Sequence, residues 1–203
     1  MILVYYLVFI LCLFAVMSVY QVSANARRRK RWQDLARRLG LTYHNDQIAG
    51  SLDGVPVVVT VVIQGSGKAK EVFTRLTVQI PGKLPAGLEI TSHQLSSKLL
   101  DSEGAIELGR VALDQNLLVR GEDPDEIQTW ANQETVKFSL LRLATLPLGP
   151  SKLSDNKLVV ESYNATLDND ELEDALHDLV ALVRGIAPNA GGSTRLLPSD
   201  RKA

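Results

Sequence analysis

The feature that most constrains this chain is an uncharged apolar run near its start, from Ile2 to Tyr20. As a helix, a run of this length spans roughly 28 Å, which is close to the hydrocarbon thickness of a bilayer. A basic cluster follows the run, and basic residues beside a span favour the cytoplasmic side. The sequence therefore predicts a transmembrane helix over residues 2–22. The N-terminus is expected outside and the remaining chain in the cytoplasm, at a plasma membrane or a bacterial inner membrane.

A cleaved signal peptide is the alternative interpretation of this run. Ala24-Asn25-Ala26 has the small-residue pattern of a cleavage site. However, no basic region precedes the apolar run, and the run is longer than the core of an ordinary signal peptide. The pattern favours a retained single-pass anchor.

The basic cluster admits two functions of its own. It can simply fix the orientation of the span, or it can bind anionic lipid, where each basic residue contributes roughly 1 kcal/mol near the surface. The candidate membrane-surface residues are Arg27, Arg28, Arg29, Lys30 and Arg31. Trp32, Leu35, Ala36 and Leu39 then recur at helical spacing up to Gly40, so we predict a basic juxtamembrane helix over residues 23–40.

Charge is divided unevenly along the rest of the chain. Residues 39–194 hold 12 basic and 21 acidic side chains. An acidic domain repels phosphates, so we expect no nucleic-acid partner. The single cysteine, Cys12, lies in the apolar run, which excludes an intramolecular disulfide and a cysteine-based metal site.

Alternating and turn-bounded segments predict a mostly antiparallel sheet. Asp53-Gly54 is typical of a tight hairpin turn, and Asp155-Asn156 marks a second hairpin. The strand after Asp53-Gly54 is apolar on both faces and is expected to be buried on both. The predicted strands are Leu41–His44, Gln47–Leu52, Val55–Gln64, Val72–Ile80, Leu88–Thr91, Leu117–Arg120 and Lys157–Ser162, with Ile106–Leu108 as a further candidate.

Two helices are predicted from their start signals. Asp123-Pro124 combines a capping residue with proline at the first helical position, and a break is expected near Ala131–Glu134. Asp168 and Glu171 have the spacing of a capping box ahead of a long apolar stripe that ends before Pro188. The predicted fold is an α+β domain over residues 41–187, in which a C-terminal amphipathic helix packs on the sheet. Residues 188–203 are predicted to form a disordered tail.

A search for chemistry finds no catalytic, cofactor-binding or metal-binding constellation. His44, His93 and His177 have no second histidine at ligand spacing. Gly65-Ser66-Gly67-Lys68 lacks both the first glycine and the following hydroxyl residue of a phosphate-binding loop. The acids from Asp168 to Asp174 lack the turn glycine of a calcium loop. We therefore expect no cofactor, no metal and no enzymatic activity.

The segment Trp32 to Leu41 reads W-x-x-L-A-x-x-L-G-L. Together with the apolar run, the basic cluster and the strand-rich remainder, it resembles a loose group of uncharacterised bacterial single-pass membrane proteins. The Leu117–Gly121 strand followed by Glu122-Asp123-Pro124 fits that layout too. Those proteins carry no assigned activity, so the resemblance implies an architecture and no site residue.

The charge pattern leads to a functional hypothesis, a membrane-tethered cytoplasmic module that binds a protein partner with a basic surface. The candidate interaction residues are Glu122, Asp123, Asp125 and Glu126, and the acids from Asp168 to Asp174 form a second candidate cluster. One alternative is a lipid-responsive module in which the polybasic segment reads the bilayer. Another is a hydrolase with an unrecognised site that uses His44 or His93.

Overall fold

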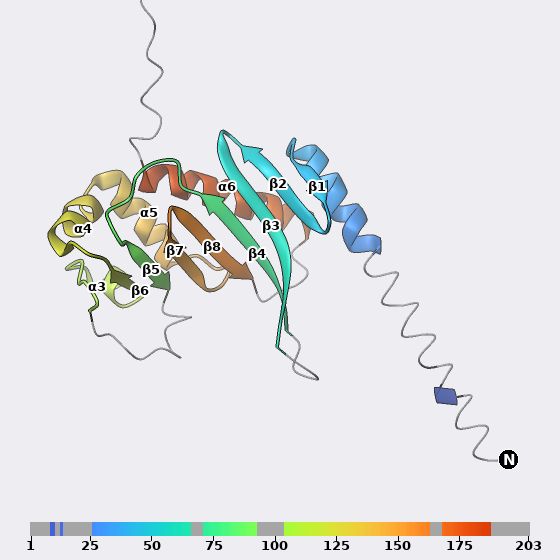
Figure 1. Ribbon diagram of the computed structural model, residues 1–203, viewed down its shortest axis with the longest axis horizontal. Coiled ribbons are helices and arrows are strands. Elements are labelled where there is room, and N and C mark those ends of the chain that lie inside the picture. The colour runs from blue at the N-terminus through green and yellow to red at the C-terminus, as the bar shows by residue number, and fades with distance from the viewer. Residues whose placement is uncertain are drawn as a thin grey trace, which may run out of the picture.

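The computed structural model describes residues 9, 10, 13, 26–65, 71–92, 104–162 and 168–187. They form the predicted α+β fold, in which one antiparallel sheet carries helices on one side (Figure 1). The elements are β1 (Thr42–His44), β2 (Gln47–Leu52), β3 (Val55–Gln64), β4 (Glu71–Gln79), β5 (Glu89–Ser92), α3 (Val111–Asp114), β6 (Leu117–Arg120), α4 (Pro124–Ala131), α5 (Glu134–Ala144), β7 (Ser151–Ser154), β8 (Lys157–Ser162) and α6 (Asn169–Ile186). Residues 26–38 form a further helix, here called the basic helix.

The sheet has eight strands in the order β1-β2-β3-β4-β8-β7-β5-β6, and every neighbouring pair is antiparallel. Tight turns join β2 to β3 and β7 to β8. Asp53 and Gly54 have φ angles of 53° and 81°, and Asp155 and Asn156 have φ angles of 50° and 55°. Positive φ at both central residues gives a turn whose twist matches that of the two strands. Both predicted hairpins are confirmed.

Only one face of the sheet is buried. Side chains alternate along each strand, and paired residues share a face. One row runs from Ile48 through Val59 and Leu76 to Val160, and all four side chains are fully buried. The opposite face of β3 is exposed or half-buried. The prediction that β3 is buried on both faces is therefore wrong, because the helices cover a single side of the sheet.

The helix α6 covers the buried face of the sheet (Figure 1). Asp168 accepts hydrogen bonds from the backbone N–H groups of Asp170 and Glu171, and Glu171 accepts one from Asp168 in return. This capping box is the predicted one, and it stabilises the start of the helix. The apolar stripe predicted for α6 is buried, at Leu172, Ala175, Leu176, Leu179, Leu182, Val183 and Ile186.

Helices α4 and α5 lie between β6 and β7 in the sequence, and α5 packs along α6. The two helices approach closely where Gly185 of α6 meets the buried Ser139 of α5. A Cβ at Gly185 would overlap the Ser139 Oγ atom. The α5–α6 contact therefore requires a residue without a side chain at position 185.

The basic helix shares the core of the sheet domain. Trp32, Leu35 and Ala36 are buried in the same hydrophobic cluster as the sheet residues. Its outer side is bonded to the start of α6: Arg38 pairs with Asp170 at 3.1 Å and with Glu173 at 3.2 Å. The predicted helical face is thus packed against the domain.

A second polar contact fastens the basic helix to the β1–β2 turn. Arg29 Nε lies 3.2 Å from Asp46 Oδ1, and the Tyr43 hydroxyl donates to the same oxygen at 2.7 Å. The Tyr43 hydrogen bond, supported by Arg29, holds the pKa of Asp46 below its ordinary value of 3.8. Burial, together with this hydrogen bond, raises the pKa of Tyr43.

The predicted membrane anchor is corrected by the structure. Among the residues described, no helix is both long enough and apolar enough to cross a membrane. The long described helices are too charged to cross a bilayer. In α6, which has 18 residues, acids and Arg184 alternate with the apolar stripe. The basic helix carries seven Lys and Arg side chains. The single-pass architecture and the membrane location that followed from it are therefore not supported. The apolar run over residues 2–22, apart from Phe9, Ile10 and Leu13, lies outside the described residues, as do residues 188–203.

We predict that Gly185→Ala destabilises the protein. Overpacking at a helix contact costs about 1–3 kcal/mol, which outweighs the roughly 1 kcal/mol by which alanine exceeds glycine in a helix. Urea unfolding should show a lower free energy of unfolding for Gly185→Ala. Ser139→Ala in the same chain should restore part of the loss, because it removes the overlapping Oγ atom. Strictly additive effects of the two substitutions would contradict this contact.

We also predict a pH-dependent contribution from Asp46. Because folding lowers its pKa below 3.8, the contribution is complete above that value and is lost as the pH falls through the lower folded pKa. Asparagine tolerates the positive φ of 57° at this position, so Asp46→Asn is a suitable variant. Wild type should exceed Asp46→Asn in unfolding free energy at about pH 7, and the difference should shrink by about pH 3. A difference independent of pH would exclude the carboxylate as its source.

Candidate functional site

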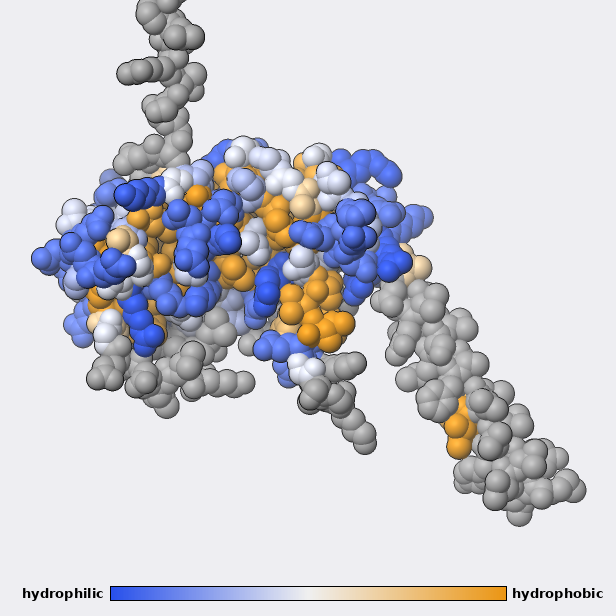
Figure 2. Space-filling model, in the orientation of Figure 1, coloured by the Kyte–Doolittle hydropathy of each residue, from blue (hydrophilic) through white to orange (hydrophobic). Residues whose placement is uncertain are grey.

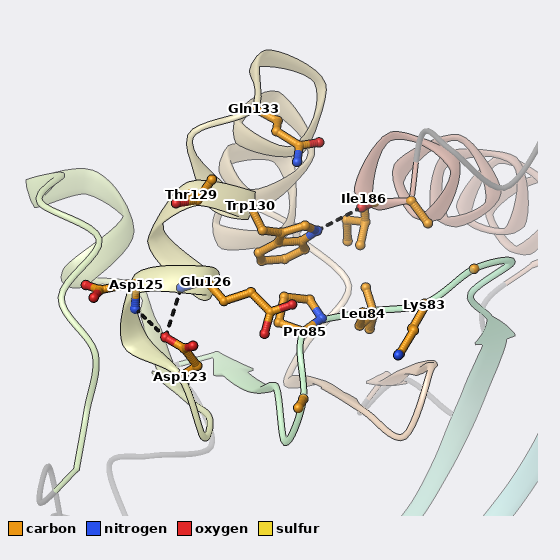
Figure 3. A pocket seen from close by; sticks show the side chains of 13 residues that line it. Lys83, Leu84, Pro85, Asp123, Asp125, Glu126, Thr129, Trp130, Gln133 and Ile186 are labelled. Carbon is orange, nitrogen blue, oxygen red and sulfur yellow. Dashed lines mark hydrogen bonds between the residues drawn. The ribbon is translucent and has the colours of Figure 1, made fainter.

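A groove of about 880 Å³ opens between the start of α4, the β4–β5 connection and the end of α6 (Figure 3). Three segments far apart in the sequence therefore build it. The lining residues are Gly82, Lys83, Leu84, Pro85 and Ala86 from the connection, Asp123, Asp125, Glu126, Thr129, Trp130 and Gln133 from α4 and its flanks, and Ile186 and Ala187 from the end of α6. Its size is that of sites that accept a small molecule or a few residues of a peptide.

One wall of the groove is formed by the first turn of α4, which carries the acids Asp123, Asp125 and Glu126. The Asp123 side chain accepts hydrogen bonds from the N–H groups of Asp125 and Glu126 at 3.0 and 3.1 Å, and Pro124 occupies the first helical position. Acids in this turn interact favourably with the helix dipole. Asp123, Asp125 and Glu126 are all exposed, and Figure 3 shows Glu126 extending from α4 toward the loop that carries Pro85.

The remaining lining includes an apolar surface. Leu84 and Pro85 are buried, Trp130 is 9% exposed, and Ile186 is fully buried. The Trp130 indole N–H donates to the Ile186 carbonyl oxygen at 3.3 Å (Figure 3). This bond joins α4 to α6 and satisfies a carbonyl at the C-terminal end of α6.

The β4–β5 connection is held against the start of α4 by backbone contacts. The Glu122 N–H donates to the Ala86 carbonyl at 3.2 Å, and Gly87 adopts a φ of +65° beside it. A Cβ at Gly87 would lie 2.8 Å from the Glu122 side chain, and one at Gly121 would overlap Ile127. Both glycines therefore permit the close approach that shapes the groove.

The predicted interaction residues are largely brought together. Three of them, Asp123, Asp125 and Glu126, line the groove, whereas Glu122 lies against Gly87 and is not among the lining residues. Among the described residues, no ion pair joins the three lining acids to a basic side chain. Lys83 is the basic residue of the lining, so the groove carries an excess of negative charge.

The second acidic cluster is already engaged within the fold. Asp168 and Glu171 form the capping box of α6. Asp170 and Glu173 pair with Arg38 of the basic helix. Most of the charge between Asp168 and Asp174 therefore stabilises the domain, and the acids around α4 are the better candidates for a partner.

The other sequence-derived candidates do not gather into a site. In the described residues no group of His, Cys, Asp and Glu side chains could hold a metal ion. His44 on β1 and His177 on α6 are exposed, and His93 lies outside the described residues. Of the basic cluster, Arg29 pairs with Asp46, and the Arg31 carbonyl accepts a hydrogen bond from Asn169. Arg27, Arg28 and Lys30 lie on the same helix, with Arg28 half-buried.

An apolar surface lies apart from the groove, at the projecting end of the β3–β4 hairpin (Figure 2). There Ile63 is 64% exposed, and Val61 and Val62 are partly exposed. The register explains the exposure: β2 pairs with β3 only as far as Thr60, so the strand continues with β4 alone beside it.

Sequence reasoning identified the acidic wall of the groove and missed its apolar lining. Leu84, Pro85 and Trp130 were not among the candidate residues. One signal was present, because Trp130 follows Ile127 at helical spacing and so extends the buried face of α4. No local pattern could place Ile186, more than fifty residues away in the chain, beside it.

Comparisons of the chain with protein-family models, with curated proteins and with solved structures found no match. The resemblance to bacterial membrane proteins therefore stays a prediction, and the groove must be interpreted from its own chemistry.

We predict that Asp123 and Asp125 differ in their effect on stability. Asp123→Ala should lower the free energy of unfolding by about 0.5–2 kcal/mol, because it removes the cap of α4. Asp123→Asn should lower it less, since asparagine caps about as well as aspartate. The Asp125 side chain forms no cap hydrogen bond. Asp125→Asn should therefore change the free energy of unfolding by only a few tenths of a kcal/mol. Equal losses for Asp123→Ala and Asp125→Asn in urea unfolding would contradict the cap.

Proposed function

We propose that this domain is a non-catalytic protein-interaction module that binds a basic, leucine-containing segment of a partner in the groove at α4. The observation that carries the proposal is one groove that combines three acids, which form no ion pair within the described part of the chain, with a largely buried apolar lining. Carboxylates attract Lys and Arg, whereas Leu84, Pro85 and Trp130 present the small exposed part of their apolar side chains to an aliphatic group. A ligand with both properties matches the groove better than a purely charged or purely apolar one.

The energetics assign different roles to the two parts. Ion pairs to exposed acids contribute only about 0.2–1 kcal/mol each, so the carboxylates mainly steer and orient the ligand. Apolar contact adds about 25 cal/mol for each Å² of apolar surface that binding removes from water. The excess of acidic residues between positions 39 and 194, 21 against 12 basic ones, favours encounter with a basic partner.

The contacts of the basic helix favour this function over the lipid-responsive alternative. That alternative requires the side chains from Arg27 to Arg31 to face a bilayer as a separate segment. Arg29 instead pairs with Asp46, and the helix is packed into the core through Trp32 and Leu35. The acids at α4 have no comparable intramolecular partner among the described residues.

The two tryptophans make a direct test possible. The chain contains Trp32 and Trp130 alone, and only Trp130 lines the groove. With 5-fluorotryptophan incorporated, the ¹⁹F spectrum reports each site separately, and Trp32→Phe assigns the signals. We predict that the blocked peptide Gly-Arg-Leu-Leu-Arg-Gly shifts the Trp130 signal and leaves that of Trp32 in place. The peptides Gly-Glu-Leu-Leu-Glu-Gly and Gly-Arg-Ser-Ser-Arg-Gly should bind at least about tenfold more weakly.

A matched pair of variants locates the attraction. Asp125→Asn/Glu126→Gln should weaken binding of the arginine–leucine peptide about two- to thirtyfold, for two exposed ion pairs. Glu71→Gln/Asp174→Asn removes the same charge from exposed positions outside the groove and should leave the affinity nearly unchanged. Equal weakening by both pairs would indicate general attraction by the acidic domain and would reject the groove. Binding should also weaken as salt increases.

A further inference from the structure

We propose that residues 188–203 of this chain are an intramolecular ligand of the groove, so that the domain carries its own competitor for partners. This inference rests on the proposed function, because it assigns a regulation to the same groove. The occupant is a named segment of the chain, and its position, reach and chemistry each support the assignment.

The segment starts at the groove itself. Ile186 and Ala187, the last described residues of the chain, are both part of the lining. Arg195 follows Ala187 by eight residues, which allows a reach of up to about 27 Å. The eight residues of α4 extend about 12 Å along their axis. The arginine can therefore reach the whole acidic wall from where the segment begins.

The sequence of the segment complements the groove. Arg195 is followed directly by Leu196 and Leu197, and Arg201 and Lys202 lie a few residues further, with Asp200 as the one acid. The groove offers three acids against Lys83, together with the apolar surface of Trp130 and its neighbours. A cation next to two leucines matches the basic, leucine-containing ligand proposed for the groove.

The composition between Ala187 and Arg195 suits a reversal of the chain. Pro188 cannot continue the hydrogen bonding of α6. Gly191 and Gly192 can adopt positive φ without steric cost. The residues needed to return the chain toward α4 are thus placed ahead of the basic and apolar ones.

Tethering makes even a weak contact effective. A short tether gives an effective concentration in the millimolar range, so a segment with a dissociation constant of roughly 0.1–0.5 mM would occupy the groove for most of the time. An external ligand must displace it, and its apparent affinity falls in proportion. We expect a three- to tenfold reduction of partner affinity by the intact segment.

The experiment compares full-length chains labelled with 5-fluorotryptophan. The test variant is Arg195→Ser/Leu196→Ser/Leu197→Ser, and the matched control is Ser193→Ala/Thr194→Ala/Ser199→Ala, three substitutions in the same segment. Without any added peptide, the test variant should shift the Trp130 signal and leave that of Trp32 in place, and the control should shift neither. With the arginine–leucine peptide added, the test variant should bind three- to tenfold more tightly than wild type.

The outcomes separate this inference from the proposed function. If the peptide binds and the acid variants weaken it, but the test variant changes neither the Trp130 signal nor the affinity, the function stands and the inference is overturned. A Trp130 difference that appears without any peptide supports the segment as a ligand even if the chosen peptide fails to bind. A difference that grows with protein concentration would place the segment in the groove of a second copy and overturn the intramolecular version.

Discussion

The packing of α6 across one face of the sheet is the interaction on which the remaining structure depends. Its buried stripe covers the strand residues that have no other shelter from water. At the start of α6, Asp170 pairs with Arg38 of the basic helix and Asn169 donates a hydrogen bond to the Arg31 carbonyl. At its end, the Ile186 carbonyl accepts a hydrogen bond from the Trp130 indole of α4. Between these points Gly185 admits α5. A single helix thus organises every other helix that lies on this side of the sheet, apart from the short α3.

This arrangement explains why one acidic cluster is left for a partner and the other is not. Four of the acids at the start of α6 bond within the fold, two to Arg38 and two in the capping box. The acids at the start of α4 face the groove, with Lys83 as the basic residue of the lining. Two helices therefore begin with the same acidic chemistry, and only the neighbouring elements decide whether it is structural or available.

The sequence was sufficient wherever a local rule decides the outcome. The bounds of β2, β3, β6 and β8 and both capped helix starts were predicted, because turn residues and caps act over a few positions. Burial of β3 on both faces was wrong, since coverage by α6 is a tertiary property. The short α3 was not foreseen, and the anchor was inferred from the uncharged apolar run and the basic cluster after it. In the groove, charge revealed the acids, whereas the lining contributed by Leu84 and Ile186 depends on contacts between distant segments.

The cap formed by Asp123 has a consequence for how such a surface can diverge. The Asp123 side chain both caps α4 and lines the groove, whereas the side chains of Asp125 and Glu126 line the groove and form no part of the cap. Replacing Asp123 therefore costs helix stability, whereas replacing Asp125 or Glu126 costs little. A lineage can exchange its preferred ligand charge at two sites while the architecture below them persists. The charge that the groove offers to a ligand can thus change without loss of stability, except at Asp123, which contributes to both.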